Sequence, residues 1–307
     1  MVFQRVSDRV YADTGTVGSG NAAAILLDDQ SVVIDAQYAA PARSLRSNIE
    51  KVSHGKITHL LLTHSHSDHV FGNEVFQDCE IVAHESLKAR MQELVNTTWS
   101  KESFQQQVAE LKKTDPERAA RFENVHVVLP TKTFQDKFVL GDRASRIEMI
   151  HTGGHTADSS IVHLPRARTV IAGDLIFAGV YPYGGDPTAD PDLWAEALIM
   201  IRNMNPQAII PGHGPVCKID EVNRYVDYIS QTKRTMLELI SQNRSEDQIL
   251  ADPSLPRFYD EGFSGRRTSS LAQWYRVWKK RTEKQRRQAN QSILASHLLE
   301  PNTHRQK

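Results

Sequence analysis

The sequence contains few cysteines, no long apolar run and no excess of charge of either sign. Only two of its 307 residues are cysteines, Cys79 and Cys217, and they lie too far apart for a Cys-x-x-Cys motif. This argues against a disulfide scaffold or a thiolate zinc site, and it predicts a reducing, cytoplasmic environment. No apolar run approaches the roughly 18 to 20 residues of a membrane span, and the first residues lack the apolar core of a signal peptide.

The charges balance, with 37 basic and 37 acidic side chains. A balanced chain creates no global field that would attract nucleic acid or an anionic membrane. We therefore expect neither as a partner, and we leave a homo-oligomer open. The basic stretch 279–287 is typical of a solvated helix face, with nucleic-acid contact as the alternative.

Short runs rich in β-branched residues alternate with helical patterns such as 41–52 and 192–204. The runs predict strands at 23–27, 31–34, 59–62, 81–83, 147–150, 160–164, 169–172 and 208–210. Strands interleaved with helices indicate an α/β fold, in which helices cover the faces of the sheet.

Two regions depart from this alternation. Residues 85–124 are polar and charged, with apolar residues at helical spacing, which predicts a helical insertion. It is interpreted either as a lid or as a solvated helical face. After residue 220 the pattern is helical again, with long helices expected over 219–242 and 271–297. We expect a catalytic domain over 1–220 and a helical extension over 221–307.

The stretch 64–69, His-Ser-His-Ser-Asp-His, places four side chains that can bind metal within six residues. It follows the strand expected at 59–62. In an extended chain, positions 64, 66 and 68 project to one side and position 69 to the other. A loop leaving the strand end can instead direct two of these side chains at one ion and two at a second. Neutral imidazoles and carboxylates are the usual ligands of zinc and related ions.

Three further candidate ligands each follow an expected strand. His155 lies after the strand at 147–150, Asp174 after the strand at 169–172, and His213 after the strand at 208–210. Sites in α/β folds collect at strand ends, on loops held by a rigid sheet. Four strand ends that each deliver histidine or aspartate therefore predict one shared metal site.

These motifs resemble the metallo-β-lactamase superfamily of metallohydrolases. The resemblance rests on His-x-His-x-Asp-His at 64–69, Gly-His-Thr at 154–156, Gly-Asp at 173–174 and Pro-Gly-His-Gly at 211–214. It implies a four-layer αβ/βα sandwich of two mixed sheets, here with a C-terminal helical extension. It also implies a first metal held by His64, His66 and His155, a second held by Asp68, His69 and His213, and a bridging Asp174.

The resemblance implies a metal-dependent hydrolase with a small-molecule acyl substrate. Two divalent cations about 3.5 to 4 Å apart repel each other, so anions must lie between them. Asp174 would supply one and a bridging hydroxide the other, which makes Asp68 and Asp174 the expected catalytic residues. The hydroxide would attack a thioester, lactone or other ester. The expected cofactors are two zinc ions, with iron or manganese as alternatives.

A bridging aspartate resembles the ligand set of the glyoxalase II-like thioesterases and the lactonases, whereas β-lactam-hydrolysing members lack it. No match to a glutathione-binding motif is found in the C-terminal region. The loop 179–187 carries Tyr181 and Tyr183, which are expected either to contact the substrate or to pack on the core. Asp35 follows the strand at 31–34 and is a candidate to orient a ligand histidine.

Two other readings stay open. One is a mononuclear iron enzyme that resembles the persulfide dioxygenases and would use His64, His155 and Asp174. The other is a β-lactam-hydrolysing relative. The metal content of the purified protein separates the iron enzyme from a dinuclear hydrolase.

Overall fold

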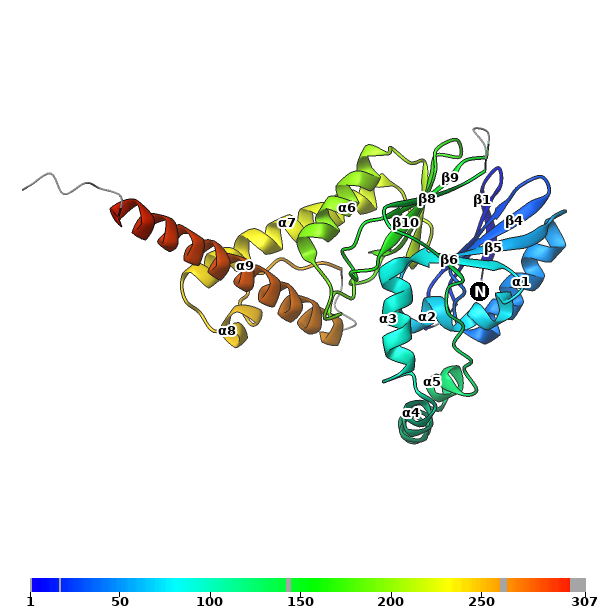
Figure 1. Cartoon of the computed structure of the whole chain (residues 1–307), viewed down its shortest axis with the longest axis horizontal. Coiled ribbons are helices and arrows are strands. Elements are labelled where there is room, and N and C mark those ends of the chain that lie inside the picture. Colours follow the sequence, from blue (N-terminus) through cyan, green and yellow to red (C-terminus); the bar gives the residue numbers. More distant parts are fainter. Residues whose placement is uncertain (1, 17, 142–144, 260–263, 299–307) are drawn as a thin grey trace, which may run out of the picture.

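The computed structural model describes residues 2–16, 18–141, 145–259 and 264–298. Two mixed β-sheets form its centre (Figure 1). The first sheet has seven strands in chain order: β1 (Val2–Ser7), β2 (Val10–Thr14), β3 (Ala22–Leu26), β4 (Gln30–Ile34), β5 (Lys56–Leu62), β6 (Glu80–His84) and β7 (Lys132–Phe134). The second has the order β12 (Ala208–His213), β11 (Thr169–Phe177), β10 (Ser160–Leu164), β9 (Ile147–His151) and β8 (Lys137–Leu140).

The pairing mode changes once within each sheet. Strands β1 to β4 pair antiparallel, and β4 to β7 pair parallel. In the second sheet only the β11–β12 pair is parallel. The helices of the N-terminal half are α1 (Ala39–Val52), α2 (Ser67–Val70), the 3-10 helix η1 (Phe71–Phe76), α3 (Glu85–Val95), α4 (Lys101–Thr114) and α5 (Pro116–Phe122). Those of the C-terminal half are α6 (Pro191–Asn203), α7 (Ile219–Ser241), α8 (Glu246–Leu250) and α9 (Ser264–Leu298).

Three apolar clusters separate four layers. Ala23 and Ile25 of β3 pack in one cluster with Ile171 of the second sheet, so this cluster lies between the sheets. The intervening Ala24 belongs to a cluster with Leu45 of α1 on the outer face. This alternation follows from the period of two in a strand, which sends successive side chains to opposite faces. The third cluster joins β11 to α6, α7 and α9. The expected sandwich of two mixed sheets flanked by helices is confirmed.

The stretch expected as a helical insertion forms α3, α4 and α5, and α4 and α5 lie at the far end of α3 (Figure 1). The C-terminal helices do not stand apart from the core. Trp274 of α9 packs on Trp194 of α6, with ring centroids 6.0 Å apart, inside the cluster that contains β11. The division at residue 220 therefore stays a prediction.

Several strands were not expected from the sequence. Strands β1 and β2 were missed, and so were β7 and β8, which have three and four residues. β1 has no buried residue, and a strand of this kind carries little apolar periodicity. β11 was expected to end at residue 172 but continues to Phe177.

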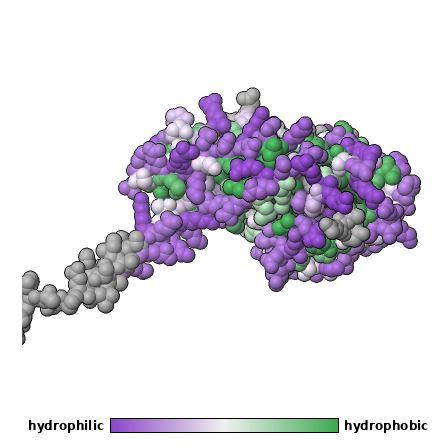
Figure 2. Space-filling model, turned by 90° about the horizontal axis from the view of Figure 1, so that it is seen from above, coloured by the Kyte–Doolittle hydropathy of each residue, from purple (hydrophilic) through white to green (hydrophobic). Residues whose placement is uncertain are grey.

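On the face shown in Figure 2, hydrophilic residues predominate and hydrophobic residues are scattered between them. Among the described helices, none has the length and apolar character needed to cross a bilayer.

Candidate metal centre

All seven histidine and aspartate residues predicted as ligands lie together, close to the C-terminal ends of strands from both sheets. His64 and His66 follow β5, and Asp68 and His69 lie on the short helix α2. The remaining three come from the second sheet: His155 from the loop after β9, Asp174 from β11 and His213 from the end of β12. Their candidate ligand atoms form two groups, within each of which the atoms lie no more than 4.8 Å apart.

The first group contains His64, His66, His155 and Asp174. Nε2 of His155 lies 3.0 Å from Nδ1 of His66, which shows that the two rings point at the same place. Oδ2 of Asp174 lies 3.4 Å from Nε2 of His155 and 3.6 Å from Nε2 of His64. Three imidazole nitrogens and one carboxylate oxygen thus converge, which is a donor set suited to zinc.

The second group contains Asp68, His69 and His213. Nε2 of His213 lies 3.3 Å from Oδ2 of Asp68. The other oxygen of Asp174, Oδ1, lies 3.1 Å from Nε2 of His69 and 3.4 Å from Nε2 of His213. Asp174 therefore offers one oxygen to each group, the arrangement expected of a bridging carboxylate.

An irregularity in β11 positions Asp174. The register between β11 and β12 shifts on both sides of Gly173, and Gly173 has a φ of +52°, a conformation that favours glycine. Such an irregularity redirects a side chain without ending the strand. The expectation that β11 ends before Asp174 is therefore wrong: the residue lies inside the strand.

Asp35 contacts His69, one of the histidines predicted as ligands. Its Oδ2 lies 2.8 Å from Nδ1 of His69, and its two oxygens accept hydrogen bonds from the backbone N–H and the hydroxyl of Thr63, each at 2.7 Å. This contact is the one that the expected role of Asp35 requires, and the role itself stays a prediction. A carboxylate on Nδ1 selects the tautomer that leaves Nε2 unprotonated for a metal.

Asp186 contacts His66 in the same way, through the ring nitrogen that faces away from the cluster. This aspartate was not identified from the sequence. Its Oδ2 lies 3.1 Å from Nε2 of His66 and accepts a hydrogen bond of 2.8 Å from Arg90 of α3. Its Oδ1 accepts hydrogen bonds from the backbone N–H and the hydroxyl of Thr188. The loop 179–187 was singled out for its tyrosines, and no local pattern in it points to the aspartate.

Replacing Asp186 by asparagine should lower the affinity of the first group for zinc about 10- to 100-fold, the usual effect of losing a carboxylate behind a ligand histidine. Competition with a chromophoric chelator measures this affinity. Asp8→Asn, at an exposed position in the turn after β1, is the matched control. An unchanged zinc affinity in Asp186→Asn would show that His66 needs no orienting partner.

Gly20 lies directly against the imidazole ring of His69. A Cβ added to Gly20 would lie 2.3 Å from Nε2 of His69, closer than any real contact of this kind. The next residue, Asn21, donates hydrogen bonds of 2.8 Å to the carbonyls of Pro211 and Gly214 on either side of His213. The segment before β3 therefore fixes His69 through its lack of a side chain and His213 through its amide.

Burial and neighbouring charges set the protonation of the cluster. Burial opposes the ionisation of Asp174, but the imidazoles of His213, His69 and His64 hold its pKa well below the usual value. Burial disfavours the charged form of His213, yet Asp174 and Asp68 raise its pKa to about 9. Burial together with the charge of His69 lowers the pKa of His64. Asp174 and Asp68 thus favour the protonated form of His213, and a bound cation would displace that proton.

Buried polar atoms without hydrogen-bond partners also indicate that the site fits a metal. Nε2 of His64, Nε2 of His69 and Oδ1 of Asp174 are buried and have no hydrogen-bond partner within the described residues. Buried polar atoms are normally paired, because an unpaired one loses its hydration without compensation. One of these atoms lies in the first group and two lie at the second, and cations bound in the two groups would satisfy them.

Four residues of the cluster, His66, Asp68, Asp174 and His213, line a cavity of about 650 Å³. The insertion supplies much of its wall, including Arg90, Trp99 and Arg121, and α9 supplies Arg266. Tyr183 also lines the cavity, with its ring centroid 6.1 Å from that of His66.

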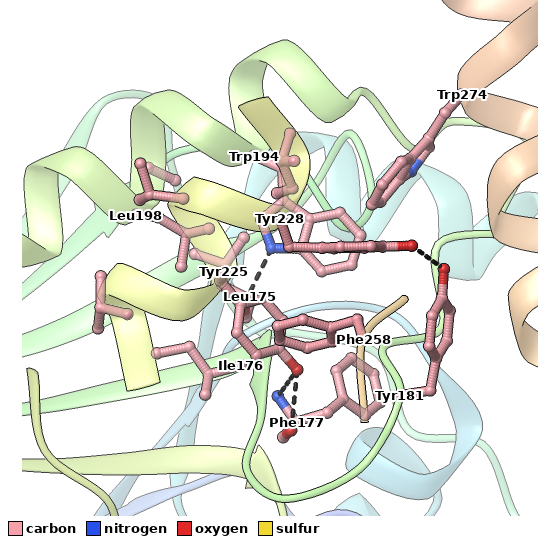
Figure 3. Close-up of a cluster of buried hydrophobic side chains, with 14 of the residues drawn as sticks. Leu175, Ile176, Phe177, Tyr181, Trp194, Leu198, Tyr225, Tyr228, Phe258 and Trp274 are labelled. Carbon is pink, nitrogen blue, oxygen red and sulfur yellow. Dashed lines mark hydrogen bonds between the residues drawn. The ribbon is translucent and has the colours of Figure 1, made fainter. Parts of the chain in front are cut away.

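Tyr181 does not line this cavity. It is 1% exposed, and its hydroxyl is hydrogen-bonded to that of Tyr228 inside the apolar cluster (Figure 3). Of the two tyrosines expected to contact the substrate, only Tyr183 is placed to do so. Tyr181 packs on the core, the other outcome considered for this loop.

The profile of the Metallo-beta-lactamase superfamily matches residues 15–213. The Beta-lactamase-like protein 2 homolog of Caenorhabditis elegans is 24% identical over 249 residues, which are 78% of this chain and 71% of that protein. A linear primary-alkylsulfatase of Pseudomonas sp. (strain ATCC 19151) is 23% identical over 247 residues, which are 70% of this chain and 46% of the sulfatase, so the match spans about half of that protein. A metallo-beta-lactamase structure from Pontibacter korlensis matches with a TM-score of 0.58 and 18% identity, over 75% of this chain and 98% of that one.

Proposed function

Because the chain belongs to the metallo-beta-lactamase superfamily, we propose that it is a dinuclear metal-dependent hydrolase acting on a thioester, lactone or other ester. The observation that carries the proposal is the placement of Asp174, whose two oxygens approach two separate ligand groups at 3.1 to 3.6 Å. Two divalent cations in these groups would supply a hydroxide nucleophile at neutral pH and polarise the scissile carbonyl.

The protein side chains would hold and orient the reacting groups. We propose Asp174 as the bridging anion and Asp68 as the carboxylate of the second group that faces the cavity, where it is 20% exposed. Tyr183 would donate a hydrogen bond to the oxyanion. Burial raises the pKa of Tyr183, so its hydroxyl keeps its proton at neutral pH.

One observation favours a second candidate reaction, the hydrolysis of a sulfate ester. The relative from Pseudomonas is named a linear primary-alkylsulfatase. A mononuclear iron dioxygenase and β-lactam hydrolysis are further alternatives from the sequence. A cytoplasmic location and the lack of nucleic-acid and membrane partners also stay predictions.

A hydrolysis panel on protein of known metal content tests the proposal. It would contain a thioester, a lactone, a 4-nitrophenyl carboxylic ester, an alkyl sulfate, a phosphodiester and a β-lactam. We expect zinc-dependent turnover of a carboxylic ester or thioester that is lost on chelation and restored by zinc. His155→Ala should lower this turnover at least about 10³-fold, since metals supply several kcal/mol of transition-state stabilisation.

His54→Ala, at an exposed histidine after α1, is the matched control and should retain full turnover. Near-normal turnover in His155→Ala would remove the mechanism. One iron per chain together with oxygen uptake on a persulfide would replace the proposal by the iron enzyme. Turnover of the alkyl sulfate alone would move the proposal to the second candidate.

A further inference from the structure

The wall of the active-site cavity carries four arginines: Arg90, Arg118, Arg121 and Arg266. We propose that the substrate is a small anionic ester whose carboxylate, sulfate or phosphate group is held by Arg118, Arg121 and Arg266. This inference rests on the proposed hydrolase function and adds the chemical class of its substrate.

Arg118 and Arg121 lie three residues apart on α5, and this spacing places them on the same face of the helix. Neither forms an ion pair with any residue in the described part of the chain, whereas Arg90 is paired with Asp186 at 2.8 Å. The charges of the two α5 arginines are therefore available to a ligand, and that of Arg90 is largely compensated.

Arg121 is held in place by a contact that depends on glycine. It donates a hydrogen bond of 3.0 Å to the carbonyl of Gly18. A Cβ on Gly18 would lie 1.9 Å from Nη1 of Arg121, so the guanidinium approaches only because Gly18 has no side chain. An arginine that only forms part of a solvent-exposed helix face does not need such a close backbone contact. The remaining N–H groups of the guanidinium can bind an anion in a bidentate way.

Arg266 reaches the same cavity from a different part of the chain. It belongs to α9, and its guanidinium carbon lies 5.7 Å from the centroid of Phe177, the last residue of β11. Its Nη1 also donates to the carbonyl of Tyr181 at 3.5 Å. The insertion and the C-terminal helix, more than a hundred residues apart, thus both deliver guanidinium groups to one cavity.

The four arginines give this cavity a basic wall, although the whole chain has equal numbers of basic and acidic residues, 37 of each. The acidic residues of the wall, Asp68 and Asp174, face the metal groups, whose cations would add further positive charge. A cleft lined by one sign of charge concentrates ligands of the opposite sign. Arginine matches the planar geometry of carboxylate and phosphate better than lysine does. A neutral ester would leave these groups unused.

A matched pair of esters tests the inference: mono-4-nitrophenyl glutarate, which carries a carboxylate, and its methyl ester, which is neutral. For the zinc-loaded protein we expect kcat/KM to favour the anionic ester by about tenfold or more, mainly through KM, since hydrogen bonds to charged groups are the stronger class. In Arg118→Gln/Arg121→Gln this ratio should fall towards one. The double lysine variant should keep part of it, and Arg202→Gln, an exposed arginine of α6, should keep all of it.

Calorimetric titration of the same proteins with monomethyl glutarate gives a readout that needs no turnover. The zinc-loaded wild type should bind this anion about tenfold more tightly than the glutamine double variant. Hydrolysis of both esters without charge preference, or an equal ratio in the double variant, would overturn the inference and leave the hydrolase proposal intact. Arginine-dependent binding of the anion without hydrolysis of any carboxylic ester would overturn the proposed reaction instead.

Discussion

Replacing Asp174 by alanine is expected to lower kcat/KM for a hydrolysed ester by at least about 10³-fold, because metal ions supply several kcal/mol of transition-state stabilisation and each 1.36 kcal/mol is tenfold in rate. Its two oxygens approach ligand atoms of both groups, at 3.1 Å from Nε2 of His69 and 3.4 Å from Nε2 of His155. Without the carboxylate the second group loses an anionic neighbour, so its metal occupancy should fall below one per chain.

Elemental analysis of the purified variant, together with ester hydrolysis at saturating zinc, measures both effects. Asp227→Ala, at an exposed aspartate of α7, provides the control for loss of a carboxylate. Far-ultraviolet circular dichroism of the metal-free proteins checks that the fold is retained. An unchanged stoichiometry of two metals in Asp174→Ala would contradict the bridge.

The variant Gly20→Ala should lose the second metal although it alters no ligand. The added methyl group would lie 2.3 Å from Nε2 and 2.4 Å from Cε1 of His69. The ring has little room to move, since its Nδ1 is held by Asp35 at 2.8 Å and its centroid lies 4.3 Å from that of His64. We expect a loss of at least about 100-fold in activity. This is the upper end of the range of about 10- to 100-fold that is usual when a residue that supports a metal ligand is changed. Overpacking should also cost about 1–3 kcal/mol of stability.

Gly265→Ala is the matched control. Gly265 lies at the start of α9 with nothing within 4 Å of an added Cβ, so the same chemical change should leave zinc affinity and activity unaltered. Zinc titration and denaturant unfolding of both variants separate loss of the metal from loss of the fold. If Gly20→Ala kept its affinity for the second metal, His69 would not be positioned by close contact with the backbone.

Much of the fold and the ligand set could be predicted from the sequence. The strand expected at 160–164 and the helix expected at 219–242 agree with β10 and α7 to within one residue. Both have strong apolar periodicity, which is a local property of the chain. The edge strand β1 has no such periodicity and is stabilised by its pairing with β2, which a local pattern does not contain.

In the candidate site, too, some features could be predicted from the sequence and others come only from the structure. The histidines and aspartates at 64–69, 155, 174 and 213 could be predicted because each follows an apolar run and few other roles require these residue types so close together. Their distribution over two groups and the opposite directions of the two Asp174 oxygens come from the structure. The sequence alone only implied this arrangement through a resemblance.

The sequence by itself determined an α/β fold with a metal centre at its strand ends. Tertiary structure alone decided what surrounds that centre: Asp186 behind His66, Gly20 against His69, and the arginines of α5 and α9 over the cavity. The physical reason is the distance along the chain between the residues that interact. Periodicity and ligand chemistry are encoded in neighbouring residues, whereas these contacts join segments tens to hundreds of residues apart and exist only after the layers have packed.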